Sequence, residues 1–332
     1  MIILSVETSC DETSVAITQD GQTVLSNVVL SQMKTHALYG GVVPEIASRE
    51  HVKGIHFVFD KALKDAKVKA QDIDLVAVTQ GPGLIGSLLV GINAAKAFAF
   101  AHQKPIIGVH HIVGHIYANQ IVKPMVFPLV ALVISGGHTE LILMKDHYHF
   151  ERLGKTEDDA IGEAYDKVAR VLDIGYPGGP KLDQLATQGT PSYKMPEIQV
   201  KDFNFSYSGL KSHIINLQHH HHQKNEAINS KDLAASFQTA AFQQIFSKTL
   251  KAIERYQPKQ LLVAGGVASN SYMRKHIHQL SDHVEVVIPP FEYCTDNAAM
   301  IGIAAYYQWQ KHPESAPMNF NGEARLAIEF NR

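Results

Sequence analysis

Two histidines set one helical turn apart are the residues of this chain best suited to chemistry. His111 and His115 lie in the stretch His110–His115, and in a helix both imidazoles would share one face. Two imidazoles so placed can bind one metal ion, although two hydrogen-bonded, partly buried histidines would give the same spacing. The apolar run 105–109 just before them predicts a buried strand. The histidines would therefore follow the carboxyl end of a strand, where open α/β sheets bind ligands.

The order of predicted elements occurs twice along the chain. In each half three strands are followed by a helix, a strand, a helix, a strand and a helix, and a duplicated unit explains this most simply. His111 begins the helix after the last strand of the first half, and Asp296 begins the equivalent helix of the second. If the halves face each other across a cleft, these positions can converge. His111, His115 and Asp296 would then form a site with open positions, typical of a catalytic metal, unless Asp296 only caps its helix.

Length and composition indicate two folded domains. A chain of 332 residues favours two domains of about 150 residues each. We place them at 1–128 and 129–332, with a mostly helical insertion at about 155–254 in the second. The net charge of −2 lacks the basic excess of a stand-alone nucleic-acid binder. Two cysteines, no signal peptide and no apolar run of membrane-spanning length favour a cytoplasmic protein without membrane contact.

Two glycine loops follow predicted buried strands. They are Ser135–His138 and Gly265–Asn270, and glycine there lets the backbone approach a ligand and leaves N–H groups free for phosphate. Tight turns without a ligand are the alternative for either loop. Together with Asp11 and Glu12 in the first turn, the two loops favour a nucleotide in the cleft, yet neither matches the P-loop or dinucleotide patterns. The topology looks like the actin, sugar-kinase and Hsp70 (ASKHA) architecture, an α/β fold of two duplicated RNase H-like domains around an adenine nucleotide.

Seven motifs in one order make the chain similar to a known family. They are Glu7–Ser14, Gly108–His115, Ser135–Glu140, Tyr176–Pro180, Ser206–Lys211, Gly265–Asn270 and Cys294–Asn297. With them the chain resembles the bacterial tRNA N6-adenosine threonylcarbamoyltransferase (TsaD) family, formerly labelled a glycoprotease, from its first residues to about Ala305. Such enzymes move a threonylcarbamoyl group from threonylcarbamoyl-AMP to the exocyclic amine of the adenosine 3′-adjacent to the anticodon.

The resemblance also implies site residues, a metal and partners. It assigns metal ligation to His111, His115 and Asp296, and the metal to iron, although two imidazoles and a carboxylate would equally accept zinc. It implies tRNA as substrate, an upstream threonylcarbamoyl-AMP synthase, a paralogous TsaB-like partner on the amino-terminal helices and a small TsaE-like ATPase. The substrate contacts it implies are Val133, Ile134, Ser135, Gly136, Gly137, Asp166, Gly179, Asp183 and Asn270.

The reaction needs an activated carbonyl, because an adenine amine is a poor nucleophile. A Lewis-acidic ion can activate the carbonyl or stabilise the departing phosphate, and glycine-loop N–H groups can hold that anion. Asp11 and Glu12 are candidates for removing the amine proton or orienting substrate, although turn roles would explain acids there as well.

Three other functions remain open at this stage. A zinc peptidase of the H-E-x-x-H type needs a glutamate after its first histidine, and here that residue is Ile112. A sugar or acetate kinase would hold Mg²⁺ by carboxylates and water, and an adenine-nucleotide-binding scaffold would catalyse nothing. The tract His219–His222 is expected to be a solvated loop that can bind metal adventitiously.

Overall fold

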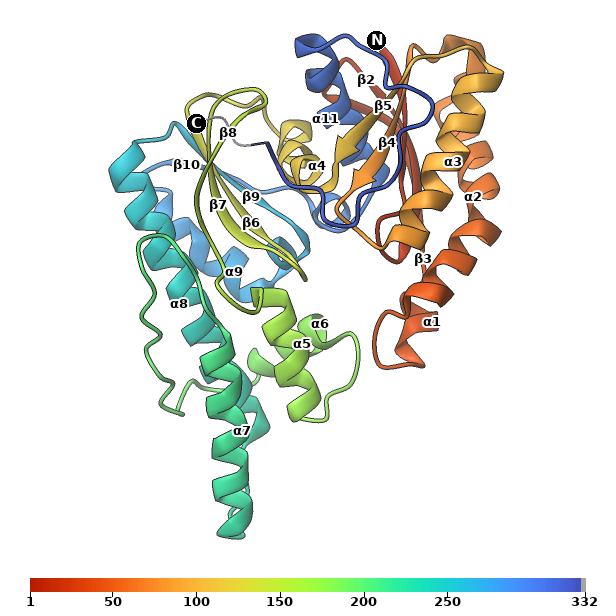
Figure 1. The fold of residues 1–332 in the computed structure, drawn as a ribbon. Helices are drawn as coiled ribbons and strands as arrows, with labels where there is room; N and C mark the ends of the chain where they lie inside the picture. The colour runs from red at the N-terminus through yellow and green to blue at the C-terminus, as the bar shows by residue number, and fades with distance from the viewer. Residues whose placement is uncertain (330–332) are drawn as a thin grey trace. The chain divides into compact units, whose positions relative to one another are not determined.

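The computed structural model describes residues 1–329 and divides into two compact units (Figure 1). Of the described residues, the first unit comprises Met1–Met125, Asp146–Phe150 and Pro289–Glu329, and the second comprises Val126–Lys145 and Glu151–Ile288. The expected division after residue 128 lies close to this first break. Residues 289–329 were expected in the second domain but belong to the first unit, because their helix α11 (Ala298–Lys311) packs across the sheet of that unit, chiefly on its first two strands.

The first unit is built on a five-stranded mixed sheet of order β3-β2-β1-β4-β5. Strands β1, β2 and β3 pair antiparallel, whereas β4 pairs parallel with β1 and β5. Strands β1 and β4 are buried almost throughout, which explains their continuous apolar runs. The strands are β1 (Ile2–Glu7), β2 (Glu12–Gln19), β3 (Thr23–Ser31), β4 (Leu75–Gly81) and β5 (Ile106–His110).

Helices cover both faces of this sheet. Val15 and Ile17 of β2 face a core shared with α2 (Pro44–Ala66) and α3 (Ile85–Ala101), whereas Ala16 between them packs against α11. Helix α2 begins at Pro44, as its sequence predicts for a first helical residue. The remaining helices of this unit are α1 (Met33–Ala37), α4 (His111–Tyr117) and α10 (Phe291–Cys294).

The second unit repeats this topology. Its sheet has the order β10-β9-β6-β7-β8, the order of the first sheet read from the other end, so the predicted duplication is confirmed. Its strands are β6 (Leu129–Ile134), β7 (Thr139–Asp146), β8 (His149–Lys155), β9 (Gln260–Ala264) and β10 (Glu285–Val287). Its helices are α5 (Ile161–Val171), α6 (Gly178–Ala186), α7 (Ser208–Gln223), α8 (Ser230–Tyr256) and α9 (Ser271–His276).

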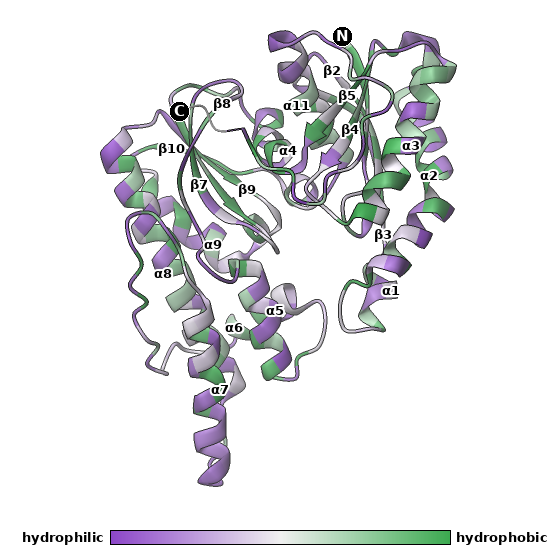
Figure 2. Ribbon diagram, viewed as in Figure 1, coloured by the Kyte–Doolittle hydropathy of each residue, from purple (hydrophilic) through white to green (hydrophobic). Residues whose placement is uncertain are grey.

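The histidine tract departs from expectation. His219–His222 lie in the last turns of α7 rather than in a loop, and the carbonyls of His220, His221 and His222 accept hydrogen bonds from the residues that end the helix. Figure 2 shows this end of α7 as hydrophilic on every side, so no apolar stripe marks it in the sequence. Among residues 1–329, no helix is long and apolar enough to cross a membrane.

Candidate metal centre

Helix α4 presents its two histidines as the spacing predicts. The helix begins at His111, directly after β5, and His110 caps it by accepting a hydrogen bond from the Ile112 backbone N–H over 3.1 Å. One turn separates His111 from His115, and their ring centroids lie 4.7 Å apart. His115 is almost completely buried, whereas His111 keeps a small exposed edge. Both imidazoles therefore line one face of α4.

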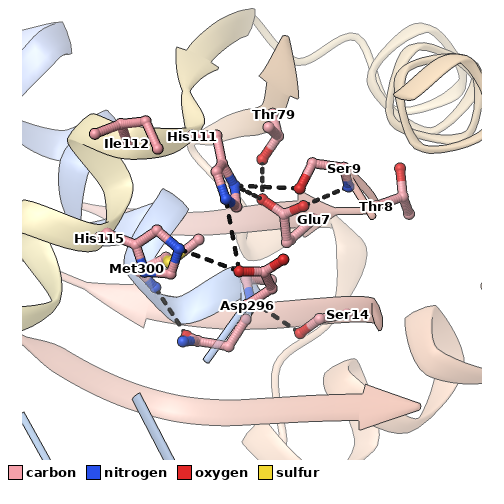
Figure 3. Close-up of polar contacts among 12 residues, drawn as sticks. Glu7, Thr8, Ser9, Ser14, Thr79, His111, Ile112, His115, Asp296 and Met300 are labelled. Carbon is pink, nitrogen blue, oxygen red and sulfur yellow. Dashed lines mark hydrogen bonds and ion pairs between the residues drawn. The ribbon is translucent and has the colours of Figure 1, made fainter. Parts of the chain in front are cut away.

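Asp296 completes the group from the other end of the chain. Its Oδ1 lies 3.1 Å from His115 Nε2 and 3.5 Å from His111 Nε2 (Figure 3). The alternative that Asp296 only caps α11 is wrong, because Asn297 is the cap and accepts from the Met300 N–H over 3.1 Å. One ligand atom from each of His111, His115 and Asp296 lies within 4.8 Å of the others, so the group could hold a metal ion.

The three residues meet within the first unit. We expected them to converge if two facing halves met across a cleft. Instead, Asp296 joins the histidines because the segment from Pro289 onward packs with the first unit, where Ala298 and Ala299 of α11 are buried against Ala16 of β2. Small side chains at these positions let the start of α11 approach the sheet closely.

Glu7, which the sequence analysis left without a role, supports His111. It ends β1, is fully buried, and its Oε2 lies 3.1 Å from His111 Nδ1. Thr79 donates to the same oxygen over 2.6 Å, and the Ser9 N–H donates to Oε1. Because an ionised carboxylate only accepts, Nδ1 carries a proton, and Nε2 is the nitrogen that can bind a metal once it has lost its own proton. The sequence signal was a single charged residue at the end of an apolar strand.

Neighbouring charges determine the protonation of His111 and Glu7. Burial lowers the pKa of His111, but the neighbouring Asp296 and Glu7 carboxylates outweigh it and raise that pKa to about 9. Burial raises the pKa of Glu7, but the His111 imidazolium outweighs it and holds the pKa below its ordinary value. Without a metal, His111 is thus a cation between two carboxylates, and a divalent ion can replace its proton. Two imidazoles and a carboxylate suit iron or zinc.

Asp11 and Glu12 lie on the same unit as the metal group. Glu12 begins β2, and its Oε1 accepts from Ser31 Oγ over 3.0 Å. Burial, followed by the charges of Asp296 and Asp11, raises the pKa of Glu12 to about 9. In the metal-free chain at neutral pH Glu12 can therefore donate a proton but not accept one. This favours Asp11 over Glu12 as a base.

The glycine-loop residues lie in the second unit. Val133 and Ile134 are buried in β6 and pair with Glu140 and Thr139 of β7, so they fix the strand end from which the loop leaves. Ser135 follows them, and its carbonyl accepts from the Gly162 N–H at the start of α5 over 3.2 Å. Beside Gly136 and Gly137 there is open space. The loop thus exposes its backbone, as a phosphate-binding turn requires.

The other four expected substrate residues form two pairs, each organised by a carboxylate. Asp166 Oδ1 accepts from the N–H groups of Gly178 and Gly179 over 3.0 and 3.1 Å, which fixes the start of α6. Asp183 accepts from the backbone N–H and the hydroxyl of Ser271, both over 2.8 Å, beside Asn270, which caps α9. The structure therefore pairs Asp166 with Gly179 and places Asp183 next to Asn270.

A family model supplies the deciding comparison. The model of the TsaD family, described as tRNA N6-adenosine threonylcarbamoyltransferase, matches residues 23–303. The chain belongs to this family. Two relatives that carry the TsaD-family name come from Staphylococcus saprophyticus subsp. saprophyticus and Staphylococcus haemolyticus. They are 54% and 52% identical to this chain, and each match covers 99% of this chain and 97% of the relative. The zinc-peptidase, kinase and scaffold alternatives lose their support.

Solved structures agree on the fold. HypF from T. kodakarensis superposes with a TM-score of 0.66 over 93% of this chain and 48% of that chain, at 13% identity. At such low identity the similarity concerns the fold alone. It agrees with the two-domain α/β architecture of the ASKHA type that the repeated element order indicates.

Proposed function

We propose that this chain transfers the threonylcarbamoyl group from threonylcarbamoyl-AMP to the exocyclic amine of the adenosine 3′-adjacent to the anticodon. The tRNAs concerned read codons that start with adenine, and AMP is released. Membership of the TsaD family over most of the chain supports this reaction. The structural observation that carries it is the arrangement Glu7–His111–Asp296, in which a buried carboxylate holds a histidine against a second carboxylate.

The metal-binding role falls to the first unit. His111, His115 and Asp296 would hold one divalent ion, Fe²⁺ in the first place and Zn²⁺ as the alternative. When bound, the ion supplies Lewis acidity for the carbonyl of the mixed anhydride or for the departing phosphate. Glu7 keeps the proton of His111 on Nδ1 and so keeps Nε2 available.

Substrate binding falls to the second unit. The open backbone of Gly136 and Gly137, which follows Val133, Ile134 and Ser135, can donate hydrogen bonds to the anionic adenylate, while Ser135 holds the turn through its N–H bond to the His138 carbonyl. Asp166 holds the turn that contains Gly179, and Asp183 holds the turn that contains Asn270. These residues would bind the adenine nucleotide portion of the donor.

Proton transfer falls to the acidic turn before β2. The adenine nitrogen attacks the carbonyl carbon, the bond from that carbon to the phosphate oxygen breaks, and one N–H proton must leave. Asp11 is our candidate to accept this proton. Glu12, whose pKa is raised to about 9, would orient substrate as a donor.

The remaining components are tRNA, a paralogous partner, a small ATPase and the enzyme that forms the adenylate. We place the paralogous partner on α1 and α2, because large apolar side chains are exposed just after α1, at Leu38 and Tyr39, and on α2, at Val52 and Phe57. The two free cysteines suit a reducing cytoplasm as the place of reaction.

The test is product formation. Labelled threonine, bicarbonate, ATP, the adenylate-forming enzyme and the partner proteins are incubated with unmodified tRNA and this chain. We expect label in tRNA that nuclease digestion places on one modified adenosine, with release of AMP. Nucleotide binding without label in tRNA would contradict the proposal.

A further inference from the structure

A buried histidine on α2 holds the turn that carries Asp11 and Glu12. The His51 side chain is fully buried; its Nε2 lies 2.9 Å from the Cys10 carbonyl oxygen and its Nδ1 lies 2.7 Å from Thr13 Oγ1. Because a carbonyl oxygen can only accept, Nε2 carries the proton, and Nδ1 accepts from the Thr13 hydroxyl. One imidazole thus joins to the helix both ends of Cys10–Thr13, the acidic turn together with the first two residues of β2.

The next carbonyl of the turn is held from the β3 side. The Gln32 N–H donates to the Asp11 carbonyl over 3.0 Å, and Ser31 Oγ donates to the Glu12 carboxyl. The Gln32 amide also donates to the Ala47 carbonyl of α2 over 3.2 Å. The Cys10 carbonyl is therefore held by His51 of α2. The Asp11 carbonyl is held by Gln32, whose side chain is itself hydrogen-bonded to α2.

The helix lies close enough to the sheet for this bridge. Gly54 follows His51 on the buried face of α2, and a Cβ at this position would collide with the Leu30 side chain of β3. Leu30 is partly exposed and its side chain could turn aside, so the contact shows how closely α2 packs on β3 at this point. His51, one turn before Gly54 on the same face, lies within hydrogen-bonding distance of the acidic turn.

We infer that His51 is a positioning residue for the transfer reaction, because its two hydrogen bonds fix the backbone that carries Asp11 and Glu12 in the unit that holds Asp296. The part of this inference that concerns catalysis rests on the proposed function. The claim that His51 holds the acidic turn in place does not depend on that function. If His51 were simply a core residue, an apolar side chain would replace it at the expense of stability alone.

Two substitutions separate the two hydrogen bonds. The amide of Gln reaches the position of Nε2 and keeps the donor to the Cys10 carbonyl, whereas the amide of Asn reaches only the position of Nδ1 and keeps the contact with Thr13. His51→Leu removes both bonds. His56→Asn makes the same change as His51→Asn at an exposed position of the same helix and is the matched control.

The thiol of Cys10 reports on the turn without any need for activity. Burial, with the Asp11 and Asp296 charges, raises the pKa of this thiol, so a maleimide or disulfide reagent reacts slowly with the native chain. Cys294 is fully buried, and a Cys10→Ala chain gives its background. We expect His51→Asn and His51→Leu to speed Cys10 modification about tenfold, while His51→Gln and His56→Asn stay near the parent. Equal rates in His51→Gln and His51→Leu, or no change in any variant, would overturn the inference.

Steady-state transfer then tests the catalytic part. We expect kcat to fall about tenfold in His51→Asn and His51→Leu, with KM for tRNA unchanged and His51→Gln close to the parent. Faster Cys10 modification in His51→Asn and His51→Leu with an unchanged kcat would refute the positioning role. If the parent chain itself transfers nothing, the proposed function fails, but the Cys10 rates still decide whether His51 holds the turn.

Discussion

Glu7 accepts a hydrogen bond from Nδ1 of His111, and this buried contact orients the imidazole whose Nε2 lies 3.5 Å from Asp296. Three segments far apart in the sequence meet here: the end of β1, the start of α4 and the residue before the cap of α11. A histidine held by a carboxylate on one nitrogen and open on the other is the usual form of a metal ligand.

Replacing Glu7 by its amide should weaken metal binding. Glu7→Gln keeps the shape but removes the charge that holds the proton on Nδ1, so we expect metal affinity to fall roughly 10–100-fold with the fold intact. Competition with a chelator of known affinity measures this. Glu151→Gln, at an exposed ion pair with Lys145 in the second unit, is the control. An unchanged affinity in Glu7→Gln would contradict the support given to His111.

Metal binding should release a proton at neutral pH. The pKa of His111 is raised to about 9 in the metal-free chain, so at pH 7.5 the ion must displace about one proton. Metal affinity should therefore rise with pH and level off above about 9. Calorimetry in two buffers of different ionisation enthalpy counts the protons. Binding heats that do not depend on the buffer would show that His111 is neutral before the metal arrives.

The same raised pKa has a consequence for the stability of the metal-free chain. Because the folded-state pKa lies above the unfolded value, the contribution of His111 is fully present below about pH 6.5 and is lost as pH rises through about 9. We expect the Tm of the metal-free chain to fall over this window more steeply than that of His111→Gln. Parallel Tm curves for the two chains would argue against a protonated His111.

In the second unit, Asp183 should affect substrate rather than metal. Asp183→Asn loses an acceptor for Ser271, so Asn270 shifts and a non-hydrolysable adenylate analogue should bind about tenfold more weakly. Metal uptake should be unchanged, because the metal group lies in the other unit. Asp282→Asn, an exposed aspartate in a turn, serves as control. Loss of metal together with loss of the analogue would count against separate roles.

A glycine loop offers a test of the fold with an adjacent control. Gly265 has φ of +94°, and a Cβ there would collide with the Ile134 carbonyl, so Gly265→Ala should destabilise the chain by ~1–3 kcal/mol. Gly266 has open space beside it, and Gly266→Ala should change stability far less. Urea unfolding of both variants gives the comparison. Similar midpoints for the two would mean that the loop relaxes freely.

Local patterns in the sequence predicted where helices and strands lie. Which unit a segment joins depends on long-range packing, which local patterns do not record. Pro44 and His111 mark helix starts that the structure confirms, because capping and breaking signals are local. Asp296 was identified through the repeat, but its neighbour Asn297 took the role of cap. The return of the segment from Pro289 to the first unit depends on contacts across the whole chain, which no local period records.

Glu7 and the histidine tract show two further limits. A lone carboxylate after an apolar strand does not name its partner, since His111 lies more than a hundred residues away along the chain. Only Leu210 and Ile214 of α7 are buried, so the end of that helix with His219–His222 carries no apolar period and was expected to be a loop.

The most direct test measures metal content and transfer in the same preparations. Each of His219, His220, His221 and His222 is first changed to Gln, so that adventitious metal does not confuse the assay. The parent, His111→Ala, Asp296→Ala and the exposed-histidine control His102→Ala are then compared. We expect one bound divalent ion per chain and labelled tRNA in the parent and the control, and loss of both in the two ligand variants. Full transfer by a chain that has lost its metal would contradict the central claim.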